Sequence, residues 1–473
     1  MTDLAYLSVA EGAALLHAKK LSPVEWTKAL LDRIDQIDEH YNAFLVVTAD
    51  RALTQAKAAE AEIAKGQWRG PMHGVPYAAK DIFDVEGMAT TCHSKIRKDH
   101  RAASDAFVVK KLRDAGAVLL GKVALHEFAT GGPAFDLPWP PARNPWNRGL
   151  HPGGSSSGSG AALAAGMAPA ALGTDTGGSV RNPATCCGII GMKPTYGAVS
   201  LSGVFPLTYS LDHVGPMTRT VEDNTILFHA IAGHDPDDPT TATRAAPDCL
   251  TDLKAGLKGL RIGVIEHFYK EDAEADPDQV RAIEQAVATL QKLGAQVKTI
   301  RLSPLSLWTD CNRTIHQAEA YAIHEKDIRE RPEDFAALTR NRLLPGAFVS
   351  SAKYIRAQQL RGALCREFAE AMHDLDAVVT LSSLLLPCRI DDPAAIAKTY
   401  DQQCRLVFNV TGTAAISVPT GHTSAGVPLA MQIAGRAFAE PMVYRIAQAF
   451  CDATGFADKR PPIKLPEKAA TAA

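Results

Sequence analysis

The feature that most constrains this chain is a run rich in glycine, serine and alanine. The run GGSSSGSGAALAAG begins at Gly153, and LGTDTGGSVRNPATCCG follows shortly after it, so that the stretch contains Ser155 and Ser179. Glycine gives up backbone entropy on folding, so many glycines together indicate a place where the backbone must approach another group closely. Peptide N–H groups that surround a reacting oxygen have this need. The stretch therefore predicts an active site with a serine nucleophile.

Runs of this composition also form flexible linkers, phosphate-binding loops and closely packed helix surfaces. Here the order of residues is specific. The first run continues through small residues into TDTGGS and then into Arg181, Pro183 and the pair Cys187-Gly188. A linker needs no such order, so we favour the active-site interpretation.

From Gly153 to Ala184 the chain resembles the amidase signature family of serine hydrolases. The similarity extends upstream to GVPYAAKDIFDVEG and downstream to GMKPTYGAVS, SLDHVGPMTRTVED, NVTGTAAISVPTG and GVPLAMQIAG. Two departures are Ser157, where glycine is common, and Cys186, at a position where an aromatic residue is frequent. The resemblance implies an α/β fold, a single layered α/β/α domain over residues 1–473 with helices flanking a mixed β-sheet.

The resemblance makes Ser179 the nucleophile that forms an acyl-enzyme, Ser155 the bridging serine and Lys80 the base behind it. It also implies a cis peptide between Gly154 and Ser155. A serine hydroxyl attacks poorly until a base takes its proton, and Ser-Lys sites are a recognised alternative to Ser-His-Asp. Lys80 must therefore be neutral when it acts. Burial in the apolar segment 75–85 would lower its pKa from about 10.4 by up to ~3–5 units.

The backbone N–H groups of the TGGS turn are the expected donors to the oxyanion, and they belong to Thr176, Gly177, Gly178 and Ser179. Loss of one such donor lowers the rate about 10²–10³-fold in serine hydrolases. The resemblance makes Asp175 and Arg181 supports of this turn.

Substrate contacts are expected from Gly131 and from Trp139, which lies in the proline-rich segment 133–152 just before the glycine run. Long loops of this kind often wall a binding site. The alternative is that Trp139 and Trp146 only hold the loop against the core.

Two further motifs are discounted. Residues 116–122 match the phosphate-loop pattern, but Val123 stands where Ser or Thr should bind magnesium, and the apolar residues 118–120 predict a strand. Ser350 and Lys353 have the S-x-x-K spacing of penicillin-binding proteins without the companion motifs. Both are attributed to chance.

Metal ligands are not expected, because neither H-E-x-x-H nor a paired C-x-x-C occurs in the sequence. No cofactor is expected either. The G-x-S-x-G pattern of Ser-His-Asp hydrolases is broken at Arg181, so His213 is assigned a structural role.

Composition bears on whether the protein binds nucleic acid or a membrane and on the compartment in which it works. A net charge of −2 with 22% charged residues gives no reason to expect nucleic acid. No apolar run approaches the ~20 residues that cross a bilayer, so no membrane role is expected. The nine cysteines are scattered and odd in number, and no apolar leader is recognised. These features predict a cytoplasmic enzyme.

Local signals predict helices at the start of the chain and a β-α-β unit later. Ser8 with Glu11 and Ser22 with Glu25 have capping-box spacing. LRIGVIE at 260–266 and QVKTIRL at 296–302 predict strands on either side of a helix over 276–293. AVVTLSS, AAISVPT and LAMQIAG are further candidate strands.

Alternating strands and helices argue for one layered domain. Within it we expect a helical N-terminal part at about 1–65, a signature core at about 70–230, a C-terminal α/β part at about 258–457 and a frayed tail at 458–473.

The favoured function is hydrolysis of a small-molecule amide, with esters, carbamates and aryl amides as further substrates. The first alternative is the glutaminase subunit of a tRNA-dependent amidotransferase. Its usual aspartate would fall near Gln402, although Asp401 is adjacent. The second is a non-catalytic amide-binding protein on the same scaffold, and the intact catalytic positions argue against it. A homodimer is compatible with the sequence, which does not decide the matter.

Overall fold

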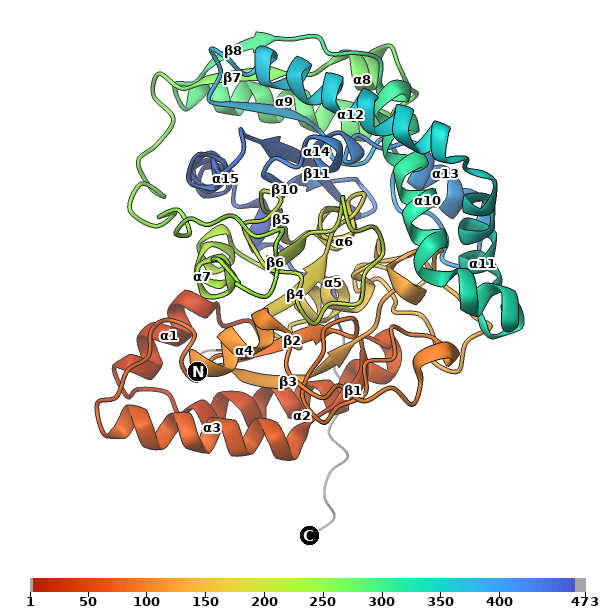
Figure 1. The fold of residues 1–473 in the computed structure, drawn as a ribbon. Coiled ribbons are helices and arrows are strands. Elements are labelled where there is room, and N and C mark those ends of the chain that lie inside the picture. Colours follow the sequence, from red (N-terminus) through yellow and green to blue (C-terminus); the bar gives the residue numbers. More distant parts are fainter. Residues whose placement is uncertain (1–2, 464–473) are drawn as a thin grey trace.

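One mixed β-sheet of 11 strands organises the molecule, and helices cover it (Figure 1). The structure is a computed structural model that describes residues 3–463. In spatial order the strands are β1 (Phe44–Val47), β3 (Val118–Val123), β2 (Pro76–Lys80), β4 (Ala170–Thr174), β6 (Val214–Thr218), β5 (Ile190–Lys193), β10 (Ala415–His422), β11 (Pro428–Ala434), β9 (Ala377–Leu381), β7 (Arg261–Val264) and β8 (Gln296–Thr299). The expected mixed sheet is confirmed.

Strand direction changes along this sheet. Strand β2 pairs in parallel with both β3 and β4, and β7 pairs in parallel with both β8 and β9. The strands between these two groups pair antiparallel from β4 through β6, β5, β10 and β11 to β9. Parallel strands need a crossover connection, usually a helix, and here helices connect them.

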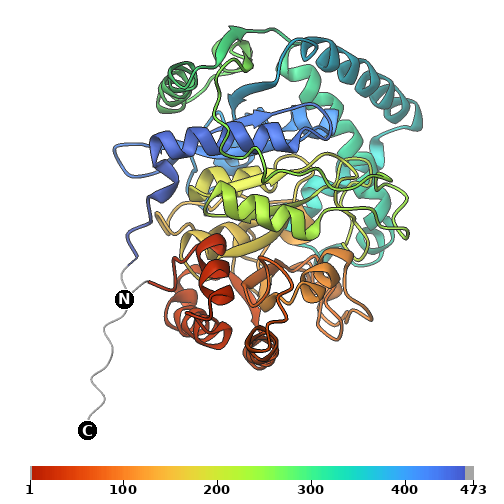
Figure 2. The same ribbon diagram turned by 90° about the vertical axis from the view of Figure 1, so that its left-hand side faces the viewer.

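Helices lie on both sides of the sheet. They are α1 (Val9–His17), α2 (Pro23–Tyr41), α3 (Ala49–Ala64), α4 (Phe107–Asp114), α5 (Ser157–Ala164), α6 (Arg181–Cys187), α7 (Val221–Ile231), α8 (His267–Lys270), α9 (Pro277–Lys292), α10 (Leu305–Glu330), α11 (Ala337–Leu343), α12 (Ser351–Ala371), α13 (Pro393–Asp401), α14 (Leu406–Thr411) and α15 (Glu440–Thr454). Helices α7 and α15 lie on the side turned toward the viewer in Figure 2. Helices α10 to α13 gather at the right of Figure 1.

The local signals that predicted the first helices and the later β-α-β unit are confirmed. Ser8 and Glu11 form a complete capping box on α1, and the Ser22 hydroxyl accepts the N–H groups at the start of α2. Strands β7 and β8 flank α9, which ends just before Gly294 in a left-handed conformation, φ +97°. Glycine adopts this conformation without steric cost, so it stops the helix there.

The S-x-x-K spacing has a local structural explanation. Ser350 is the N-cap of α12, and its hydroxyl accepts the Lys353 N–H. In the part of the chain that the structure describes, no helix combines the length and the apolar character needed to span a bilayer. Residues 464–473 of the expected frayed tail lie outside the described residues.

The small-residue run forms α5, and every residue of this helix is buried. A Cβ on Gly158 would lie 2.5 Å from the Ala43 carbonyl oxygen, and one on Gly160 would lie 2.9 Å from Pro183. Real Cβ atoms do not make such contacts, so the glycines allow this helix to lie directly against neighbouring backbone. The chain just before α5 is thereby held in the centre of the molecule.

Candidate active site

Lys80, the candidate base, and the hydroxyl of Thr174 lie at the ends of two parallel strands. Lys80 is the last residue of β2, and Thr174 is the last residue of β4. Because the strands are parallel, their carboxyl ends meet at one edge of the sheet, which is where α/β folds commonly bind ligands. The Lys80 Nζ lies 2.8 Å from the Thr174 Oγ1 and 2.8 Å from the Ser155 Oγ.

Lys80 is fully buried. Burial lowers its pKa to about 7, against the opposing effect of the Asp212 and Asp175 carboxylates. A lysine of this pKa is neutral in a large fraction of molecules at neutral pH, which is the state a general base requires. The direction of the shift is the one the apolar sequence around Lys80 predicts.

The two serines of the glycine-rich stretch line one pocket. Ser155 follows a cis peptide bond from Gly154. Ser179 lies in the turn between β4 and α6, and its carbonyl oxygen accepts the Ser156 N–H at 3.2 Å. Lys80, Ser155 and Ser179 are thus brought together as the resemblance implied.

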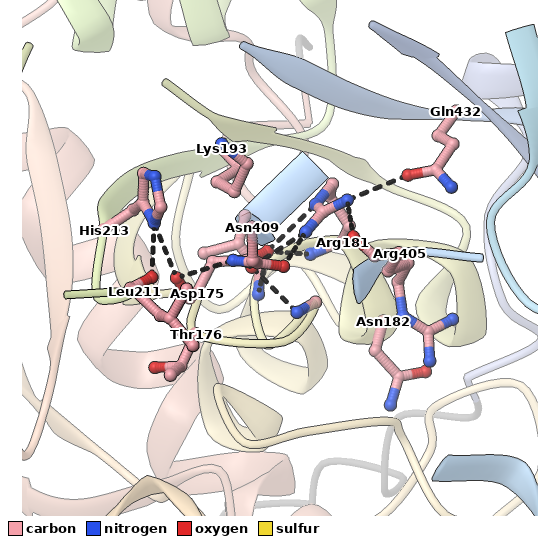
Figure 3. A network of polar contacts seen from close by, with 12 residues as sticks. Asp175, Thr176, Arg181, Asn182, Lys193, Leu211, His213, Arg405, Asn409 and Gln432 are labelled. Carbon is pink, nitrogen blue, oxygen red and sulfur yellow. Dashed lines mark hydrogen bonds and ion pairs between the residues drawn. The ribbon is translucent and has the colours of Figure 1, made fainter. Parts of the chain in front are cut away.

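The Asp175 carboxylate organises the turn that carries Ser179 (Figure 3). It accepts the N–H groups of Gly178 at 2.8 Å, Val180 at 3.2 Å and Arg181 at 3.4 Å. The Gly178 N–H is therefore directed at Asp175 and away from the pocket, which corrects its assignment as an oxyanion donor. The N–H groups of Thr176, Gly177 and Ser179 donate to no described protein atom, so they remain as the candidate donors.

Arg181 completes this buried network. Its guanidinium contacts Asp175 at 2.9 Å and also donates to Asn409, to Gln432 and to the Arg405 carbonyl (Figure 3). The opposite charge and the hydrogen bonds from Arg181 hold the pKa of Asp175 well below its usual range despite burial. Asp175 and Arg181 are positioned to brace the turn.

Asp212 is a neighbour of the turn and lies in the SLDHVGPMTRTVED motif, although the sequence assigned it no role. The Thr176 hydroxyl donates to the Asp212 carboxylate at 2.5 Å, and burial raises the pKa of Asp212 to about 6. The next residue, His213, donates through Nδ1 to the carbonyl oxygens of Leu211 and Asp175 (Figure 3). These contacts agree with the assignment of His213 as a structural residue.

The two residues expected to contact substrate lie in different places. Gly131 lines the pocket. Trp139 is not among the residues that line it, because the proline-rich loop carries it to His93, where the rings meet edge-on at 5.8 Å. Trp146 packs against His422 at 4.7 Å and donates to the Cys187 carbonyl. The tryptophans hold the loop, as the alternative interpretation proposed.

Apart from Asp401, sequence reasoning missed the polar wall of the pocket. This wall comes from η2 (Glu127–Ala129) and the residue before it, and from α10, α11 and α13, and it includes His126, Arg313, Arg342, Tyr400 and Asp401. Arg313 and Asp401 form an ion pair at 2.7 Å. Arg342 forms no ion pair with any of residues 3–463. No short motif marks the other residues of this wall, because they come from separate segments.

In the part of the chain that the structure describes, no group of three or more histidine, cysteine, aspartate or glutamate side chains is arranged to hold a metal ion.

A buried lysine behind two serines, at the end of a parallel strand pair, is the arrangement expected of a serine hydrolase with a lysine base. A family model described as Amidase matches residues 25–444. The chain belongs to this amidase family, whose enzymes hydrolyse carbon–nitrogen bonds.

Known relatives cover nearly the whole chain. A Glutamyl-tRNA(Gln) amidotransferase component from Moorella thermoacetica is 37% identical over 98% of this chain and 99% of its own length. Among solved structures, a chain from a vestigial protein complex that reveals the origins of an s-triazine catabolic enzyme has a TM-score of 0.89 at 31% identity, over 94% of this chain and 98% of that one. The native peptide amidase of Stenotrophomonas maltophilia has a TM-score of 0.85 at 31% identity, over 96% and 98%.

These relatives correct one expectation. The net charge predicted no nucleic-acid partner, whereas several amidotransferase components that this chain resembles carry a tRNA in their name. The expectation is wrong because net charge sums the whole surface and does not report on a local patch or on a partner protein.

Proposed function

We propose that this protein is a serine amidohydrolase that releases ammonia from a small amide carrying a carboxylate, with glutamine as the first candidate. The observation that carries the proposal is one pocket that contains both Ser179 and an arginine, Arg342, with no carboxylate partner among the described residues. The lysine base supports hydrolysis, and the arginine supports an anionic substrate.

In the proposed reaction, Lys80 takes a proton from Ser155, which in turn takes the proton of Ser179. The Ser179 oxygen attacks the amide carbon, and the N–H groups of Thr176, Gly177 and Ser179 stabilise the oxyanion. The same proton path, reversed, protonates the departing ammonia. Water then attacks the acyl-enzyme by the same route and releases the carboxylic acid.

Arg342 supports the anionic part of the substrate. Burial lowers its pKa, but an arginine stays charged in proteins, so an unpaired guanidinium inside a pocket favours an anion. Its planar donors match a carboxylate in a two-point contact. A neutral aryl amide would leave this charge without a partner.

The relatives favour a more specific function, in which the chain is the glutamine-hydrolysing component of a Glu-tRNA(Gln) amidotransferase. The sequence raised one objection, since Gln402 stands where an aspartate is usual. In the structure Asp401 lines the pocket, while Gln402 is not among the lining residues. The neighbouring carboxylate can therefore face the ammonium group of glutamine, and this supports the assignment.

Ammonia release tests the proposal directly. The purified chain is assayed with glutamine, with succinamate, which carries a carboxylate, and with butyramide, which does not. We expect turnover of glutamine or succinamate that is lost in Ser179→Ala and in Lys80→Ala. Turnover of butyramide and aryl amides only would reject the anionic substrate, and an inactive wild type that binds an amide would favour the non-catalytic alternative.

The proposed role in an amidotransferase has its own experiment. Glutamine hydrolysis is compared for the chain alone and for the chain with the remaining amidotransferase components and Glu-tRNA(Gln). We expect the partners to co-purify with it and to increase glutamine turnover. Full activity alone, with no co-purification, would leave an independent amidase.

A further inference from the structure

His126 is a buried pocket residue that the proposed reaction does not yet use. It lines the same pocket as Ser155 and Ser179, and only 4% of it is exposed. Its Nε2 has no hydrogen-bond partner in the described structure. A buried polar atom without a partner is uncommon in native proteins, and one that lies in a pocket is a candidate to bind a group outside the chain.

The position of the imidazole is fixed from two sides. The ring lies against the Cα of Gly154, where any Cβ would overlap it. The backbone N–H of His126 donates to the Ser155 carbonyl at 3.0 Å. On the other side, the Tyr400 hydroxyl lies 3.4 Å from the His126 Nδ1. The ring therefore cannot turn away from the pocket without disturbing its neighbours.

The contact between the Tyr400 hydroxyl and Nδ1 is compatible with either tautomer of His126, and the inference uses the tautomer in which Tyr400 donates. Burial, and then the nearby charges of His151, Lys80 and Arg342, hold the pKa of His126 well below its ordinary 6.5, so the imidazole is neutral and carries one N–H. Burial raises the pKa of Tyr400, so the phenol keeps its proton. When the Tyr400 hydroxyl donates to Nδ1, the N–H must lie on Nε2. Nε2 is then a hydrogen-bond donor.

Arg342 lies on the same wall. Its guanidinium carbon is 5.0 Å from the centroid of the Tyr400 ring, and the His126 ring centroid is 6.1 Å from that centroid. Tyr400 thus contacts both groups. A carboxylate has two oxygens and about four acceptor positions, so it can accept from a guanidinium and from one further N–H at the same time.

We propose that His126, oriented by Tyr400, donates its Nε2–H to the substrate carboxylate that Arg342 binds, and so selects amides that carry this group. This inference rests on the proposed anionic substrate and adds a specificity-determining residue to it. His126 takes no part in proton transfer to or from Ser179.

Three variants separate a hydrogen-bonding role from a packing role. His126→Gln keeps an N–H donor on a side chain of similar reach, His126→Leu removes the donor, and Tyr400→Phe removes only the hydroxyl that fixes the tautomer. The readout is the ratio of kcat/KM for succinamate to that for butyramide, which differ by one carboxylate. We expect this ratio to fall about 10–100-fold in His126→Leu, less in Tyr400→Phe, and to recover in His126→Gln, since a hydrogen bond to a charged group has about this effect.

An equal loss for both substrates in His126→Leu would overturn the inference, because it would indicate damage to Ser155 or to the fold. The rate at which phenylmethylsulfonyl fluoride labels Ser179 detects such damage independently.

A binding experiment keeps this test separate from the proposed function. In a Ser179→Ala background, which cannot form the acyl-enzyme, calorimetry measures the Kd of succinamate. Adding His126→Leu is expected to raise that Kd about 10–100-fold, and adding His126→Gln is expected to raise it much less. An unchanged Kd in the His126→Leu variant, or no binding in Ser179→Ala, would refute the inference, whether or not the wild type turns over any amide.

Discussion

The Lys80 Nζ lies 2.8 Å from the Thr174 Oγ1, and these two residues end the parallel strands β2 and β4. The contact joins Lys80, the proposed base, to the strand that leads directly into the turn that carries Ser179, the proposed nucleophile. Two elements that are distant in the sequence are thereby held at one edge of the sheet.

Activity is expected to rise with pH through about 7. Burial lowers the pKa of Lys80 to about 7, and only the neutral amine can take a proton. Below this pH the protonated fraction grows, so kcat/KM should fall about tenfold for each pH unit. A pH profile of ammonia release checks this. Lys80→Arg should be inactive at every pH tested, because arginine stays charged, and an active Lys80→Arg would exclude Lys80 as the base.

Replacing Thr174 is expected to move that profile. The Thr174 hydroxyl oxygen accepts from Lys80, and this hydrogen bond favours the charged amine. Thr174→Val removes it, so the acid limb should move about 1–2 pH units lower, the equivalent of about 1.5–3 kcal/mol. Thr174→Ser keeps the acceptor and should restore the wild-type limb. Identical profiles for both variants would contradict this role.

The buried pair Asp175 and Arg181 is expected to contribute strongly to stability. Asp175→Asn leaves the Arg181 charge without its partner, and breaking a buried pair in this way costs about 3–5 kcal/mol. Urea unfolding measures the change. The exposed pair Arg389 and Asp391 provides the control, since Asp391→Asn should change stability by less than about 1 kcal/mol. Equal effects of the two variants would argue against this account.

Gly178 is expected to tolerate no side chain. Its φ is +111°, and a Cβ would overlap the side chain of Arg405. Gly178→Ala should therefore destabilise the protein by about 1–3 kcal/mol and abolish fluorophosphonate labelling of Ser179, because the turn must move. Gly256→Ala is a suitable control, since that glycine has φ +73° and nothing within 4 Å of its Cβ position. Full labelling of Gly178→Ala would show that the turn can adapt.

Trp139→Ala is expected to leave kcat and KM unchanged. Trp139 packs against His93 and is not among the residues that line the pocket, so its loss affects the loop alone. Steady-state kinetics with succinamate check this. A KM increase of more than about threefold, which corresponds to more than about 0.65 kcal/mol, would return Trp139 to the substrate site.

Much of the fold could be predicted locally. The capping box at Ser8, the N-cap at Ser22 and the β-α-β pattern around α9 depend on neighbouring residues, and the structure confirms them; the reciprocal contact from Glu25 that would complete a second capping box is not formed. Neighbouring residues alone could not decide whether the Gly178 N–H donates to the oxyanion. Whether an N–H faces the pocket or the Asp175 carboxylate depends on how the turn folds back on itself.

The sequence by itself determined the family and made Lys80, Ser155 and Ser179 the candidate catalytic residues, because each lies in a short motif that resembles that family. The tertiary structure decided the pKa of Lys80 and the composition of the pocket wall. The pKa depends on burial, which every neighbouring element contributes to. The wall unites His126, Arg342 and Tyr400 from three separate segments, and only packing brings such side chains together.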